Sequence, residues 1–309
     1  MNSTQEYWWK IQLELKLRRV NGNAFQDFFS DVMQELYGED FVRVRPFGSV
    51  GDKGCDGYIQ SSGQVFACYG AINGDGGKVN YLIGKMNDDF QKAKEKIQQL
   101  MKEWYLVHNL VDGLPINAVE VLNNLQQENR GIKLGFIGME GFQERIKNLN
   151  TRQVETLLGP TATHQDSLNL QTEELRDLVD AVAQAAESMT ATNSPIEPVA
   201  AEKLDYNDLP GHWHSLIAGG RQNVHLVASY LDRHPEPLRG ERIAKFLNHK
   251  YQYLRAQHLC PGSIMTELYQ IVTGNGTVSP QRQVAAQALL AHLFESCDIF
   301  ENVPTRTTK

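Results

Sequence analysis

A short β-hairpin with an acidic residue at its start is the feature that most constrains how this chain folds. Residues 43–70 read RVRPFGSVGDKGCDGYIQSSGQVFACYG. A strand-like run at 41–45 leads into a glycine-rich loop that holds Asp56. Two β segments follow, at 57–60 and 64–69, and a Ser-Ser-Gly turn joins them. The sequence therefore predicts a small sheet in which one strand delivers side chains beside Asp56.

The length and charge of the chain limit its domain count and its partners. It has 309 residues, which favours two domains, and it is 41% hydrophobic and 22% charged, as is ordinary for globular proteins. Its formal net charge is −7 and its pI is about 5.7. Stand-alone DNA-binding domains usually carry a basic surplus that displaces counterions. A nucleic-acid contact would therefore need a local basic patch or a basic partner subunit.

Neither membrane insertion nor export is indicated. No apolar run approaches the roughly 18 residues that a membrane helix needs. The N-terminus, MNSTQEYWWK, has no basic segment followed by an apolar core. The cysteines show neither CxxC spacing nor a dense framework, which favours reduced thiols: Cys55, Cys68, Cys260 and Cys297. We expect a cytoplasmic protein.

The apolar pattern predicts a mixed sheet flanked by helices in the first 150 residues, in the order α-β-β-β-α-β-α-β-α. Before this series, residues 8–20 alternate in a way that favours a strand over a short helix. Residues 25–36 have a strong helical period. A long helix is predicted from Ile83 to Trp104, with a lysine-rich outer face that we interpret as solvated or paired with neighbouring carboxylates.

The character of the sequence changes after residue 150. Residues 151–203 are predicted to form a helical connector, and residues 190–199 (TATNSPIEPV) are its linker. Residues 204–309 show helical patterns without a convincing strand. The predicted fold is thus an α/β domain at 1–150, the connector, and an all-α C-terminal domain at 204–309.

Asp56 is the candidate metal ligand of the hairpin. Phosphodiester hydrolysis needs a divalent metal that activates water and neutralises developing charge. Mg²⁺ prefers carboxylates together with retained waters. The preceding helix offers Gln26 or Asp27 as a second ligand. The second strand should then supply an acidic or amide side chain and, two positions on, a Lys.

The order of elements and the stretch GDKGCDG resemble the restriction-endonuclease-like (PD-(D/E)xK) superfamily, especially its type IV restriction branch. In that pattern Asp56 matches the metal-binding Asp, and Gln26 in AFQDFF matches the acidic or amide residue of the first helix. Phe66 stands where Gln or Glu is expected, and Cys68 stands where Lys is expected. Phe has no ligand atom and a thiol carries no positive charge. The resemblance therefore implies a degenerate nuclease fold kept for binding or assembly.

A nuclease that is active within a complex is the alternative. Its catalytic residues would be Asp56, Gln26 and Lys53, with Mg²⁺ or Mn²⁺ on Asp56, and Lys85 is another source of the missing positive charge. It would act as a metal-dependent DNA endonuclease. Cys68 is a weaker candidate for a nucleophile, because its position inside a strand predicts burial.

A second resemblance covers most of the chain. The stretches that carry it are, in order, GDKGCDGYIQSSGQVFACYG, KMNDDFQKA, MKEWYLVHN, GLPINAVEVL, LLGP and HLFESCDIFE. They look like the accessory component of bacterial ABC-three-component systems, which are predicted to act against phage. Such systems encode an SMC/RecN-like ABC ATPase, a small middle component, and a third protein with a variable effector domain and a shared helical C-terminal domain.

This second resemblance implies a non-ATPase subunit of an anti-phage complex. The helical C-terminal domain would bind the ATPase and the middle component. The pseudo-nuclease domain would contact DNA or regulate assembly, and homo-oligomerisation is left open.

Overall fold

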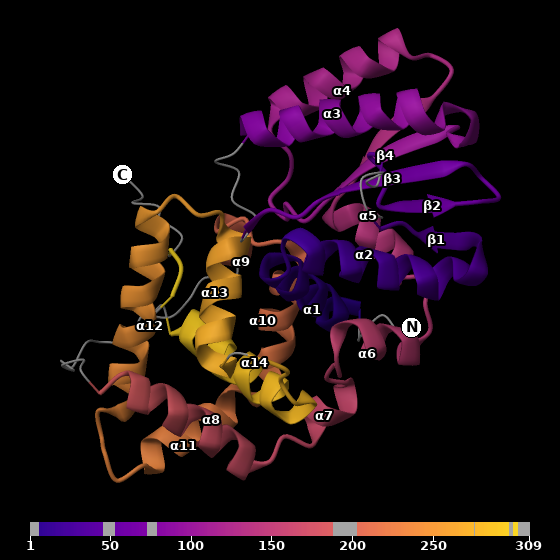
Figure 1. Cartoon of the computed structure of the whole chain (residues 1–309). Helices are drawn as coiled ribbons and strands as arrows, with labels where there is room; N and C mark the ends of the chain where they lie inside the picture. The colour runs from indigo at the N-terminus through magenta and orange to yellow at the C-terminus, as the bar shows by residue number, and fades with distance from the viewer. Residues whose placement is uncertain are drawn as a thin grey trace. The chain divides into compact units, whose positions relative to one another are not determined.

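The computed structural model divides the chain into two compact units, which can be followed by residue number in Figure 1. One unit is Gln12–Leu158, and the other combines Met1–Ile11 with Gly159–Lys309. The linker predicted at 190–199 lies outside the described residues. The structure describes residues 6–45, 53–72, 79–187, 203–274, 276–296 and 299–301.

A five-stranded mixed sheet forms the centre of the unit Gln12–Leu158, as the sequence predicts. The strand order is β1-β2-β3-β4-β5; the first three strands are antiparallel and the last three are parallel. The strands are β1 (Phe41–Arg43), β2 (Gly57–Ile59), β3 (Gln64–Tyr69), β4 (Glu103–His108) and β5 (Lys133–Ile137). The α/β class is confirmed, and the restriction-endonuclease-like assignment stays a prediction.

Helices cover both faces of this sheet (Figure 1). On one face, α3 (Val79–Ile97) and α4 (Ile116–Glu128) enclose an apolar core with β3 and β4. On the other face lie α2 (Gly22–Tyr37) and α5 (Met139–Ile146), and α6 (Thr151–Leu158) ends the unit. Six aromatic rings pack there: Phe25, Phe28, Phe29, Phe41, Phe66 and Phe142.

The strand predicted at residues 8–20 is wrong, because Glu6–Arg19 form the helix α1. Its apolar side chains are at most 2% exposed: Trp8, Trp9, Ile11, Leu13, Leu15 and Leu17. These positions point to every side of a helix, and a helix that is buried all round lacks an amphipathic period. The remaining pattern therefore resembled the alternation of a strand.

The helix predicted from residue 83 to residue 104 is also wrong at its C-terminal end. α3 ends at Ile97 and the 3₁₀ turn Gln98–Leu100 follows, so Trp104 lies in β4. Its buried indole is 5.5 Å from the ring of Phe90, centroid to centroid. The tryptophan thus reaches the core expected for the helix, but it does so from a strand.

The described residues from 203 onward are helical and contain no strand, in agreement with the prediction. Trp213, which is fully buried, lies on a helix at Gly211–Gly220. Among the described residues, no helix is long and apolar enough to cross a membrane. The helices of this unit are α7 (His164–Leu168), α8 (Thr172–Ala185), α9 (Lys203–Tyr206), α10 (Gly211–Gly220), α11 (Val224–Arg233), α12 (Arg239–Ala256), α13 (Pro261–Thr273) and α14 (Pro280–Glu295).

The helix α14 is the centre of the helical unit, and α7, α8, α10, α11 and α13 pack around it. Two fully buried glutamines connect α14 to other backbone segments. Gln283 accepts a hydrogen bond from the Ala162 amide (2.9 Å) and donates to the carbonyls of Pro160 (2.8 Å) and Val278 (2.9 Å). Gln287 donates to the Leu216 carbonyl at 3.0 Å. These bonds satisfy backbone groups that would otherwise be buried without partners.

Hydrogen bonds also join Lys203 and Asn207, at the two ends of α9, to the last turn of α14 and the segment that follows it, and we call this set the C-terminal clasp. Lys203 is 1% exposed, and its Nζ donates to the carbonyls of Phe294 (2.8 Å) and Ile299 (2.7 Å). Asn207 and Glu301 exchange two bonds, from Asn207 Nδ2 to the Glu301 carbonyl (2.8 Å) and from the Glu301 amide to Asn207 Oδ1 (2.9 Å). The charged amine and the amide side chain replace the helical partners missing after α14.

We predict that Gln283→Ala lowers the free energy of unfolding by about 2–4 kcal/mol, because it leaves a buried amide and two carbonyls without a partner. Chemical denaturation of the full chain measures this loss. Gln281→Ala is the matched control on α14, since Gln281 is exposed. Equal stability of the two variants would show that the Gln283 bonds contribute little.

His108, at the end of β4, is 4% exposed, and its Nδ1 has no hydrogen-bond partner among the described residues. Burial lowers the pKa of His108 to about 4. Its ring fills the space beside Gly138, where an added Cβ would lie 2.4 Å from the His108 Cε1. The folded state therefore favours the neutral imidazole.

A pH dependence follows from this pKa. The unfolded chain binds a proton on His108 more readily than the folded chain does. The stability that neutral His108 gives the folded chain is therefore complete above the ordinary pKa of about 6.5. As the pH falls from 6.5 towards 4, the free energy of unfolding decreases by up to about 3 kcal/mol. We predict that His108→Leu removes this part of the acid sensitivity, as measured by denaturation at several pH values. An unchanged pH profile would contradict the assignment.

Candidate functional site

The carboxylate of Asp56 lies where the hairpin meets α2. Asp56 is 9% exposed; its Oδ1 accepts a hydrogen bond from Gln26 Nε2 at 2.6 Å, and its Oδ2 accepts one from the Cys68 amide at 2.6 Å. The main chain of Asp56 also bonds to both neighbouring strands, since its amide donates to the Phe66 carbonyl (2.7 Å) and its carbonyl accepts from the Val44 amide (3.1 Å). The structure thus brings Asp56 and Gln26 together.

A third side chain, Arg45, completes this arrangement, although the sequence analysis did not single it out. Arg45 Nη1 donates to Gln26 Oε1 at 2.9 Å, and the same guanidinium also pairs with Asp27. Arg43 pairs with Asp27 and Asp31. The alternation Arg43-Val44-Arg45 contained this signal, because alternate residues of an extended segment point to the same side.

Lys53 is placed differently from the other two predicted catalytic residues. It is exposed, has a φ of 56°, and forms no hydrogen bond or ion pair with the part of the chain that the structure describes. The next residue, Gly54, has a φ of 72°, and an added Cβ there would lie 2.2 Å from the Asp89 carbonyl oxygen. This close approach requires glycine and packs the loop against α3.

The second strand supplies no catalytic group at the two positions that the nuclease pattern requires. Phe66 is fully buried and its ring lies near those of Phe29 (5.2 Å) and Tyr105 (5.8 Å). Cys68 is also buried, and its pKa is raised well above the ordinary value, first by burial and then by Asp56, with Lys85 and Arg45 opposing. A thiol with a raised pKa is a poor nucleophile at neutral pH.

The donors and acceptors around Asp56 do not fit Mg²⁺ or Mn²⁺. Gln26, the second predicted ligand, presents its NH₂ group to Asp56 rather than its oxygen, so the pair does not offer a cation two oxygen ligands. A divalent cation needs oxygen ligands. Among the described residues, no group of three or more His, Cys, Asp and Glu side chains is placed to hold a metal. No step of hydrolysis is therefore derived from this site.

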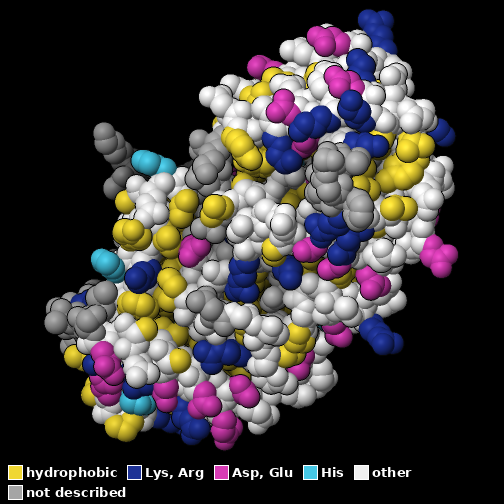
Figure 2. All heavy atoms as spheres, viewed as in Figure 1, with side chains coloured by type: hydrophobic (Ala, Val, Ile, Leu, Met, Phe, Trp, Pro, Cys, Tyr) yellow, Lys and Arg dark blue, Asp and Glu magenta, His cyan; other side chains and the backbone are white. Residues whose placement is uncertain are grey.

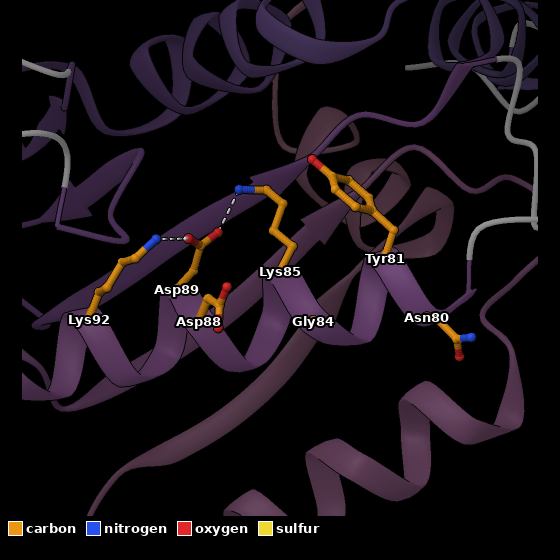
Figure 3. Close-up of a pocket in the computed structure, with 7 residues that line it drawn as sticks. All are labelled: Asn80, Tyr81, Gly84, Lys85, Asp88, Asp89 and Lys92. Atoms are coloured by element: carbon orange, nitrogen blue, oxygen red, sulfur yellow. Dashed lines mark hydrogen bonds and ion pairs between the residues drawn. The ribbon is translucent and has the colours of Figure 1, made fainter.

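A pocket of about 380 Å³ lies along α3 (Figure 3). Lys85 and Lys92 flank the buried Asp89 in this view, with Nζ to carboxylate distances of 2.6 and 3.8 Å. Part of the lysine-rich face of α3 is thus paired with a carboxylate, which agrees with the pairing expected from the sequence. Basic and acidic side chains alternate over this region (Figure 2). The residues that line the pocket are Asn80, Tyr81, Gly84, Lys85, Asp88, Asp89 and Lys92.

The helical unit has exposed apolar side chains of its own. Tyr253 near the end of α12 is 59% exposed, and residues 255–260 beyond it are all exposed. Large exposed aromatic side chains are enriched at the centres of protein interfaces. The exposed large hydrophobic residues from 203 onward, among those described, are Tyr206, Leu238, Tyr253 and Leu259.

Comparison with known proteins adds one finding on this helical unit. Residues 173–301 match the family model of C-terminal domain 10 of the ABC-three component (ABC-3C) systems. The match begins in α8, ends at the C-terminal clasp, and supports membership of the chain in these systems. No curated protein matches the chain. No solved structure matches it either.

Proposed function

From the match of residues 173–301 to an ABC-3C C-terminal domain, we propose that the chain is a non-ATPase subunit of an anti-phage defence complex. Its partners are an SMC/RecN-like ABC ATPase and a small middle component. The helical unit binds these partners, and the α/β unit contacts DNA or regulates assembly. The family match carries this proposal.

The arrangement of the helical unit agrees with a docking role. Its interior is packed around α14 and the buried glutamines. Among its described residues, the His, Cys, Asp and Glu side chains form no group of three or more that could hold a metal ion. What the unit offers a partner is therefore its surface, with Tyr253 as the largest exposed aromatic side chain on α12.

We predict that Tyr253→Asp weakens capture of the ATPase and the middle component by about tenfold or more, since it places a charge in the interface. The assay is co-purification of the three full-length proteins through a tag on this chain. Tyr81→Asp is the matched control, because Tyr81 is an exposed helical tyrosine of the α/β unit (64% against 59%). Capture that is lost equally in both variants, or in neither, would contradict docking through α12.

Contact with DNA would use the lysines of α3, which carries Lys85, Lys92, Lys94 and Lys96. We predict that the double variant Lys92→Glu/Lys96→Glu reduces DNA binding by the assembled complex, with a larger reduction at low salt. A binding titration at two salt concentrations measures this effect. Lys133→Glu/Lys147→Glu makes the same charge change at exposed positions of the same unit. If DNA binding is unchanged in the first variant, the α/β unit acts in assembly alone.

A further inference from the structure

We infer that Asp56 is a structural hydrogen-bond acceptor that holds the hairpin on α2, and that Arg45 positions Gln26 for this role. The three side chains form a chain of donors and acceptors in which Gln26 presents its NH₂ group, rather than its oxygen, to the carboxylate. This role of Asp56 does not depend on the proposed docking function, which concerns the helical unit.

The direction of the Gln26 amide follows from chemistry alone. A guanidinium has only donors, so the group that faces Arg45 Nη1 must be the amide oxygen (2.9 Å). The NH₂ group then faces the Asp56 carboxylate, which accepts its hydrogen at 2.6 Å. Arg45 in turn is held by Asp27. The orientation that suits Arg45 is therefore also the one that suits Asp56.

A metal ion bound by both Asp56 and Gln26 would require the opposite orientation of the Gln26 amide. To offer its oxygen to a cation beside Asp56, the Gln26 amide would turn its NH₂ group towards the donors of Arg45. The NH₂ group of Gln26, a residue that is 8% exposed, would then lose its Asp56 acceptor, while the Cys68 amide keeps its bond to Oδ2. Buried donors without acceptors destabilise a protein. In this environment, the carboxylate favours the backbone and Gln26 over a cation.

Exchanging the two side-chain types tests the assignment directly. In Gln26→Glu the new carboxylate faces the Asp56 carboxylate, and in Asp56→Asn an NH₂ group faces that of Gln26 or the Cys68 amide. The double variant Gln26→Glu/Asp56→Asn restores the three donor–acceptor pairs that link Arg45, position 26, position 56 and the Cys68 amide. The carboxylate introduced at position 26 then accepts from Arg45 and from the NH₂ group introduced at position 56. The amide oxygen at position 56 accepts from the Cys68 amide.

We expect each single variant of the full chain to lower Tm in EDTA by about 4–8 °C. The double variant should return to within about 2 °C of the wild-type Tm. The inference would be overturned if the Tm of the double variant fell by the sum of the two single decreases. It would also be overturned if both single variants kept the wild-type Tm. If a single variant does not fold, recovery of a folded chain by the double variant supports the assignment, and failure of both contradicts it.

The change in Tm on adding metal is a second test that distinguishes a structural Asp56 from a metal-binding Asp56. For a structural acceptor, saturating Mn²⁺ shifts the wild-type Tm by less than about 1 °C relative to EDTA. A metal site predicts a clear increase that Asp56→Asn abolishes and that Gln26→Glu preserves or enlarges, because a carboxylate is the better ligand. Such an increase, or Mn²⁺-dependent plasmid nicking by the chain that the double variant loses, would overturn the inference. Nicking lost in Asp56→Ala alone fits both roles, since that variant also removes the structural bonds.

Discussion

The geometry of the α/β unit depends on the carboxylate of Asp56. This group accepts hydrogen bonds from α2 through Gln26 and from β3 through the Cys68 amide, while the Asp56 backbone bonds to the segments before and after it. Segments 12 and 30 residues away along the chain thus meet at one residue that is 9% exposed. Buried charge is tolerated only where hydrogen bonds compensate for lost hydration, and each bond here adds to that compensation.

The sequence was most informative where local chemistry decides the structure. The turn at Ser61–Gly63 and the apolar period of α2 predicted the hairpin and the helix, whereas Gln26 or Asp27 was expected beside Asp56 as a metal ligand and Gln26 is bonded to it directly. The sequence was misleading where burial erases the pattern, as in α1, whose apolar residues surround the whole helix. Arg45 could not be ranked above the other basic residues, because its importance comes from the distance to Gln26, which only the folded backbone sets.

The two units use buried polar groups in the same way but for different ends. In the α/β unit, Asp56 and Gln26 connect a helix to a sheet. In the helical unit, Gln283 connects α14 to the extended segment at Pro160–Ala162. Asp56 and Gln283 each bond to backbone groups of another segment, which specifies one arrangement of the elements among several that hydrophobic packing alone would allow.

The C-terminal clasp has a mechanical consequence. Because Lys203 and Asn207 bond to residues 299–301, the segment from 203 to 301 is held at both of its ends by the same small set of hydrogen bonds. A displacement of the chain on either side of this segment meets those bonds first. The stretch from 203 to 301 therefore forms a loop closed without a covalent link, and its two ends separate only when those hydrogen bonds break.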